Sequence, residues 1–170
     1  MMRVAVDDLA HLDSDAIVRP ATTRLDGPQR SARRVEQVGG EEFRARLRVN
    51  AELEVGAAVV TGGGGDLRAE FVIHAIIQSD TEPVSRSGVA RAWLSVLQQA
   101  ERWGFARLAA PPIGVGPGNL SIEDAAEIMI SGLQAHRGSA ALPTDVSVVV
   151  DSAADRDAFA AALAAHGREA

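Results

Sequence analysis

The amino-acid sequence predicts an α/β fold, a three-layer α/β/α sandwich with a mixed, mostly parallel central sheet. Short runs of β-branched residues alternate along the chain with stretches of helical periodicity, a pattern typical of strands joined by covering helices. The run at residues 71–77 is strongly apolar, as expected for a strand buried on both faces. Because the chain has 170 residues, 46% of them hydrophobic, we expect a single domain spanning residues 1–170.

The first half of the chain is expected to form four strands and a broken helix. The predicted strands are residues 3–6, 16–18, 57–61 and 71–77. Helical periodicity covers residues 28–38 and 41–49, and Gly39-Gly40 divides it because glycine disfavours the helix interior. The glycines at 62–65 end the third strand in a flexible turn.

The second half continues the alternation of helix and strand. Residues 87–103 carry an apolar stripe that includes Trp93 and Leu97, which predicts an amphipathic helix. The remaining predicted elements are a strand at 107–110, a helix that follows the N-cap Ser121 and ends near His136, a strand at 146–150 and an Ala-rich helix at 154–165. Such a sheet, with helices on both faces, places ligands at the carboxyl ends of its strands.

Composition excludes several classes of function. The net charge of −6 argues against a general nucleic-acid-binding protein, which needs clustered positive charge. The absence of cysteine excludes disulfides, thiol catalysis and cysteine-bound zinc, and we expect neither a metal site nor a cofactor. No run of apolar residues approaches the length of a membrane span, and the first residues lack the apolar core of a signal peptide. We therefore expect a cytoplasmic protein without a membrane partner.

A Gly/Pro-rich loop at residues 111–119 follows one predicted strand and precedes a helix. Gly114, Gly116 and Gly118 permit close approach of the backbone and positive φ angles. Backbone amides in such a loop, next to a helix N-terminus, can form an anion-binding nest. The alternative interpretation is a tight strand-to-helix turn, and the Lys-Ser or Lys-Thr pair of a P-loop is missing.

Two further segments lie where predicted strands end. Asp7 and Asp8 leave the first strand, and a carboxylate there can accept a hydrogen bond from an exocyclic amine such as that of adenine. The alternative is a solvated acid in a turn, which we favour for Asp7. The loops after Val18, Ala110 and Val150 are therefore the segments that we expect to surround a ligand.

An ordered set of motifs resembles the macro domain, the ADP-ribose-binding module. The motifs are Asp7-Asp8-Leu9-Ala10, Asp15-Ala16-Ile17-Val18-Arg19-Pro20-Ala21-Thr22, Gly56-Ala57-Ala58-Val59-Val60-Thr61-Gly62-Gly63, Val72-Ile73-His74 and Pro111-Pro112-Ile113-Gly114-Val115-Gly116. Each motif is only moderately specific, but all occur in the family's order through nearly the whole chain. The resemblance implies a macro-domain-like fold that binds ADP-ribose or a related nucleotide.

The resemblance also implies roles for individual residues. Asp8 would hold the adenine amine, Leu9 would lie beside the ring, and Val150-Asp151 would border it. The other implied ligand-binding residues are Ala21, Thr22, Gly114, Val115, Gly116, Pro117, Gly118 and Asn119, and the backbone amides of Gly114 to Gly118 would wrap the diphosphate. His74 lies inside an apolar strand, and we interpret it as a hydrogen-bonded core histidine.

The departures from the family pattern fall around the expected catalytic end of the ligand. Thr22 replaces the asparagine that positions the reacting ribose, and Gly118 replaces an aromatic residue that covers it. The glycine-rich stretch after Thr22 is shortened to Leu25-Asp26-Gly27-Pro28, and Val150 replaces an aromatic beside adenine. Because catalysis by positioning is sensitive to small displacements, we expect binding to persist without the family's hydrolysis.

Alternative functions remain open at this point. One is a hydrolase that removes ADP-ribose from acidic side chains or deacetylates O-acetyl-ADP-ribose, with Asp26 as the base beside Thr22. A second is a binder of another, more highly phosphorylated nucleotide, served by Arg19, Arg24 and Arg30 near the mouth of the site. A third is a scaffold without ligand. For the binding module, ADP-ribosylated proteins are further candidate partners.

Overall fold

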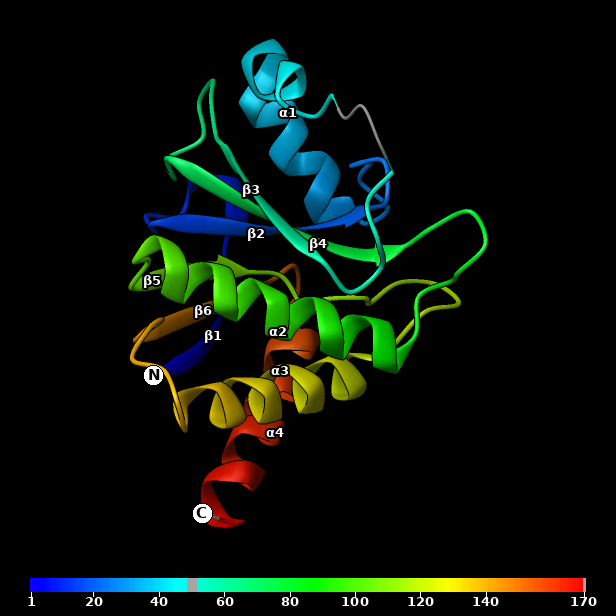
Figure 1. Ribbon diagram of the computed structural model, residues 1–170. Helices are drawn as coiled ribbons and strands as arrows, with labels where there is room; N and C mark the ends of the chain where they lie inside the picture. Colours follow the sequence, from blue (N-terminus) through cyan, green and yellow to red (C-terminus); the bar gives the residue numbers. More distant parts are fainter. Residues whose placement is uncertain (49–51, 170) are drawn as a thin grey trace.

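The computed structural model describes residues 1–48 and 52–169, and in them the strands form one six-stranded sheet (Figure 1). The strands are β1 (Met2–Val6), β2 (Ala16–Thr22), β3 (Ala58–Gly62), β4 (Phe71–Gln78), β5 (Arg107–Ala110) and β6 (Asp145–Val150). Their order across the sheet is β1-β6-β5-β2-β4-β3. Every pairing is parallel except β3 with β4, so the expectation of a mixed, mostly parallel sheet is confirmed.

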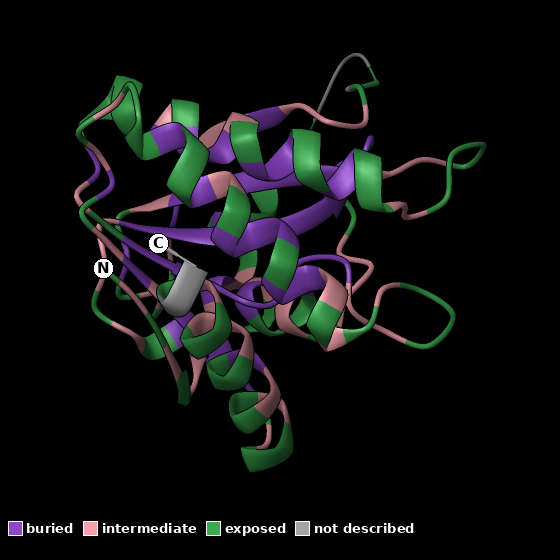
Figure 2. Cartoon of the chain, turned by 90° about the horizontal axis from the view of Figure 1, so that it is seen from below, coloured by how far each residue is buried: buried purple, intermediate pink, exposed green. Residues whose placement is uncertain are grey.

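Helices cover both faces of this sheet, which confirms the three-layer arrangement (Figure 2). The helices are α1 (Arg30–Ala45), α2 (Arg86–Trp103), α3 (Ile122–Arg137) and α4 (Ala153–Glu169), with a short 3₁₀ helix η1 at Leu9–His11. Trp93, Met129 and Phe159 of α2, α3 and α4 share one apolar core, whereas Val35 and Phe43 of α1 pack on the opposite face. Within the described residues, no helix is long and apolar enough to cross a membrane.

Local signals explain most of the helix ends. Ser121 accepts a hydrogen bond from the Asp124 amide at 3.1 Å, as the sequence predicts for an N-cap. Ser85 caps α2 in the same way, and Gly104 ends that helix in the left-handed conformation, with φ 76°. Gly40 has φ 61° and ψ −155°, so the predicted break divides α1 at this glycine.

Three predicted boundaries differ from the structure by four residues, one of them the end of α4, which lies at Glu169 instead of residue 165. β2 continues past residue 18 to Thr22, because Arg19, Pro20 and Ala21 are buried beneath neighbouring elements rather than exposed in a loop. The second part of α1 ends at Ala45 instead of continuing to 49, and Arg46 closes it through backbone hydrogen bonds. The last predicted residue of that helix, Val49, lies outside the described residues.

Arg19 lies in the interior between β2 and α1, which corrects the prediction that it stands at the mouth of a site. Its side chain is fully buried and forms an ion pair with Glu36 of α1. Its Nε donates to the Ala32 carbonyl at 3.4 Å, and its Nη1 donates to His74 Nδ1 at 3.2 Å. A buried cation needs such partners, because desolvation is otherwise prohibitive.

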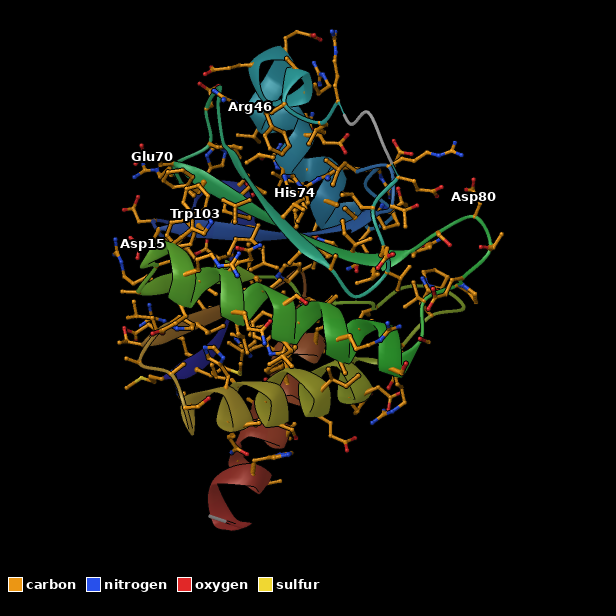
Figure 3. All side chains as sticks on the ribbon, in the orientation of Figure 1. Asp15, Arg46, Glu70, His74, Asp80 and Trp103 are labelled. Atoms are coloured by element: carbon orange, nitrogen blue, oxygen red, sulfur yellow. The ribbon has the colours of Figure 1, made fainter. Side chains whose placement is uncertain are left out.

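His74 is a hydrogen-bonded core histidine, as predicted, and Figure 3 places it on β4 beneath α1. Because Arg19 donates to Nδ1, the neutral ring carries its proton on Nε2 and donates to Thr61 Oγ1 at 2.8 Å. The ring stacks on Phe43, with 5.9 Å between centroids. Burial, reinforced by the charge of Arg19, lowers the pKa of His74 to about 3.

This histidine should make the free energy of unfolding depend on pH in mildly acidic solution. The pKa of His74 is 6.5 in the unfolded chain and about 3 in the folded protein, so between these pH values only the unfolded state binds the extra proton. The free energy of unfolding is therefore highest above pH 6.5 and falls as the pH drops below it. From pH 6.5 to about pH 5 we expect a loss of about 2 kcal/mol. Urea unfolding of the wild type and His74→Gln across this range measures it, and parallel pH profiles for the two proteins would contradict the assignment.

Candidate functional site

A cleft of two adjoining compartments opens where β1, β5 and β6 end and α1 begins. The first is lined by Gln29, Arg30, Ser31, Pro111, Pro112, Val115, Ile122, Val149, Val150, Asp151 and Asp155. The second is lined by Asp7, Asp8, Leu9, Arg30, Ser31, Arg34, Val149 and Asp151. They contain about 460 and 580 Å³ of empty space, part of which is open solvent. Because four residues line both compartments, one elongated ligand can occupy them together.

The structure brings part of the predicted site together in this cleft. Five residues of the predicted ligand set line it, namely Asp8, Leu9, Val115, Val150 and Asp151. The other predicted loop residues, Gly114, Gly116, Pro117, Gly118 and Asn119, flank Val115 in the chain without lining either compartment. Ala21 is fully buried against Leu25 and Ile76, so its side chain packs in the core rather than in the cleft.

The Gly/Pro loop between β5 and α3 adopts a conformation that favours glycine at two of its three glycine positions. Gly114 has φ 86°, and a Cβ there would lie 2.8 Å from Val89 Cγ2, so no other residue fits without displacement. Gly118 has φ 76°, so two of the three glycines use the positive φ that glycine permits, whereas Gly116 lies outside the left-handed region. The backbone amide of Leu120 donates to the Gly114 carbonyl at 3.0 Å and closes the loop.

Gln29 joins this loop to the start of α1, a contact that the sequence analysis missed. Its Oε1 accepts from the Gly114 amide at 2.8 Å, and its Nε2 donates to the Pro112 carbonyl at 3.3 Å. Gln29 is the N-cap residue of α1, yet its side chain makes no capping hydrogen bond to the helix. The first turn of α1 therefore faces the cleft without a side-chain cap.

At the other end of the cleft, Asp8 is held by groups of the chain itself. Its Oδ1 accepts from the Ala10 amide at 3.2 Å and so caps η1, and its Oδ2 accepts from Arg34 Nη2 at 2.8 Å. The hydrogen bond from Arg34 is the main reason that the pKa of Asp8 lies below its ordinary value. Arg34 was not among the residues predicted from the sequence, although its spacing of four residues from Arg30 places both on one helix face.

The segment after β2 is folded on itself and lies outside the cleft lining. Thr22 Oγ1 accepts from the amides of Arg24 and Asp26 at 3.3 and 3.2 Å, and the Thr22 amide donates to the Asp26 carbonyl at 2.9 Å. Leu25 has φ 65° and is buried. The two residues considered for catalysis, Thr22 and Asp26, are therefore engaged in a local turn and line neither compartment.

The three arginines expected at the mouth separate in the structure. Arg19 is in the core, and Arg24 is exposed and pairs at 3.3 Å with Asp80 in the loop after β4 (Figure 3). Arg30 alone of the three lines the cleft. The expected cluster was wrong because β2 runs to Thr22 and carries Arg19 inward, under α1.

Comparison with known proteins identifies relatives over most of the chain. The family model described as "Macro domain" matches residues 18–129. The chain is 34% identical over 158 residues to an uncharacterized protein of Mycobacterium tuberculosis, which covers 93% of this chain and 43% of that protein. It is 31% identical over 134 residues to an uncharacterized protein of Aquifex aeolicus, covering 78% and 81%. The chain thus spans less than half the length of its mycobacterial relatives.

Solved structures share the fold at low sequence identity. The Oceanobacillus iheyensis macrodomain with ADP superposes with a TM-score of 0.81 at 21% identity, covering 98% of this chain and 92% of that one. The Trypanosoma brucei macrodomain in complex with ADP-ribose superposes with a TM-score of 0.83 at 15% identity, covering 95% and 68%. The expected fold is thereby confirmed.

Proposed function

Because this chain belongs to the macro domain family, we propose that it binds ADP-ribose or a derivative, free or attached to a protein, in the cleft beside α1. The observation that carries the proposal is the pair of adjoining compartments, with Asp8 and Leu9 at one end and the Gly/Pro loop at the other. Two proteins of the same fold were solved with ADP and with ADP-ribose.

The chemistry of the two ends suits the two ends of such a nucleotide. Asp8 offers carboxylate lone pairs to the exocyclic amine of adenine, and Leu9 and Val149 offer apolar surface to the ring. The diphosphate belongs beside Val115 and the start of α1, where backbone amides and the positive end of the helix dipole favour an anion. This local arrangement holds a small anion despite the net negative charge of the chain.

Removal of the Asp8 carboxylate should weaken ADP-ribose binding. Asp8→Ala deletes the acceptor for the adenine amine, and we expect about tenfold lower affinity, typical of one hydrogen bond to a charged group. Calorimetric titration of the wild type and the variant measures the change. Asp13→Ala is the matched control, because Asp13 is an exposed acid that lines neither compartment. A wild type that fails to bind ADP-ribose, or an unchanged affinity in folded Asp8→Ala, would refute the proposed site.

The same geometry favours binding over the hydrolase alternative. A hydrolase of ADP-ribose esters needs a base and a positioned water beside the distal ribose. Thr22 and Asp26, the two residues offered for that task, are tied into the turn after β2 and lie outside the cleft lining. The function that we propose is therefore that of a binding module rather than a hydrolase.

A further inference from the structure

We propose that the cleft prefers an ADP-ribose derivative that carries a third phosphate on the adenosine ribose, held by Arg30 and Arg34 of α1. This inference rests on the proposed function, because it assigns the ribose position from the adenine and diphosphate positions. Of the arginine cluster expected from the sequence, Arg30 alone is retained, and Arg34 joins it in the cleft.

The two arginines lie where the adenosine ribose would be. They are four residues apart on α1, so their side chains project from the same face, one turn apart. Arg30 lines both compartments, and Arg34 lines the second one beside Asp8. A ribose that joins an adenine at Asp8 to a diphosphate at Val115 must cross the part of the cleft that the compartments share.

A hydroxyl group without a partner lies at the same place. Ser31 lines both compartments, and its Oγ is buried with no hydrogen-bond partner among the described residues. Buried hydroxyls are normally hydrogen-bonded, and in a cleft a ligand group can supply the missing partner. The first turn of α1 adds uncapped amides, because the Gln29 side chain bonds to the Gly/Pro loop instead.

The cleft contains charges of both signs, which come from different elements. Arg30 and Arg34 come from α1, whereas the acids follow β1 and β6 or belong to α4, namely Asp7, Asp8, Asp151 and Asp155. A phosphate is attracted by the arginines and repelled by the acids, while ribose hydroxyls can donate to the acids. This asymmetry orients a ribose with its phosphate toward α1.

The ion pair between Arg34 and Asp8 supplies the selectivity for the phosphorylated ligand over unmodified ADP-ribose. In the free protein Asp8 Oδ2 accepts from Arg34 Nη2 at 2.8 Å, so an adenine amine must share that carboxylate with the guanidinium. A neighbouring phosphate offers the same guanidinium a second anionic acceptor with two oxygens in matching geometry. Binding of the phosphorylated ligand therefore frees Asp8 for the adenine amine, whereas unmodified ADP-ribose has to compete with Arg34.

The test compares ADP-ribose with ADP-ribose 2′-phosphate by calorimetric titration, and its readout is the ratio of the two affinities. We expect the wild type to bind the 2′-phosphate at least about tenfold more tightly. Arg30→Gln and Arg34→Gln should each lose most of this preference. Arg44→Gln, an exposed arginine of α1 that pairs with Glu41 away from the cleft, should keep it. Raising the salt concentration should narrow the preference of the wild type.

The outcomes separate this inference from the proposed function. Equal affinities of the wild type for the two ligands would overturn the inference and leave ADP-ribose binding intact. A preference that survives in Arg34→Gln, or that disappears equally in Arg44→Gln, would also overturn it. Failure of both ligands to bind would overturn the inference and the proposed function together.

Discussion

Replacement of Val115 with glutamate is expected to lower the affinity for ADP-ribose by more than about 100-fold. Val115 lines the cleft together with Pro111 and Pro112 of the Gly/Pro loop, at the end assigned to the diphosphate. A carboxylate there would stand close to the phosphate charges, and two like charges about 4 Å apart repel by about 4 kcal/mol near a protein surface. Because the side chain of Val115 is only partly buried, the substitution should leave the fold intact.

Calorimetric titration measures this loss, and Val115→Gln separates charge from size. Glutamine has nearly the volume of glutamate but no charge, so we expect it to retain much more affinity. Circular dichroism verifies that both variants are folded. Wild-type affinity in Val115→Glu would place the diphosphate elsewhere, and equal losses in the two variants would assign the effect to crowding rather than to repulsion.

Removal of the Glu36 carboxylate should destabilise the protein by about 3 kcal/mol, at the low end of the range for breaking a buried ion pair. Arg19 is fully buried, and burial lowers its pKa while the attraction of Glu36 opposes that shift. In Glu36→Ala the cation keeps only the Ala32 carbonyl and the His74 ring as partners. The charge then remains desolvated, and of the two acids that attract Arg19 only Asp26, the weaker one, is left.

Urea unfolding at neutral pH gives the free energies for this comparison. Arg19→Met should be less costly than Glu36→Ala, because the Glu36 side chain left behind is 25% exposed and can be hydrated. Glu41→Ala is the control on the same helix, since its side chain is 92% exposed. A larger cost for Arg19→Met than for Glu36→Ala would contradict this account of the buried pair.

The sequence predicted the strands of the sheet well, because buried parallel strands are short apolar runs. Its main error was the end of β2, where Arg19 and Pro20 look like the start of a loop. Only the partner across the fold, Glu36, makes a buried arginine acceptable there, and a pairing between β2 and α1 leaves no local signal in the sequence.

The candidate site was predicted in part, for a related reason. Asp8, Leu9 and Val115 were found through motifs that follow strands, and motifs of that kind are local. Gln29 and Arg34 were missed because their roles consist of contacts to other elements, the Gly/Pro loop and Asp8. Helical spacing from Arg30 was the one signal that could have indicated Arg34.

The position of β1 at an edge of the sheet has a consequence for the order of assembly during synthesis. Among the described residues β1 pairs only with β6. Met2 therefore lies opposite Val146, although most of the chain separates these two residues in sequence. Contacts between segments so distant in sequence form late, because the long intervening chain must first be ordered. Asp7, Asp8 and Asp151 of the cleft follow these two strands. The nascent polypeptide therefore cannot complete the end of the cleft proposed for adenine until β6 has left the ribosome, even if β2, β4 and β5 have already paired.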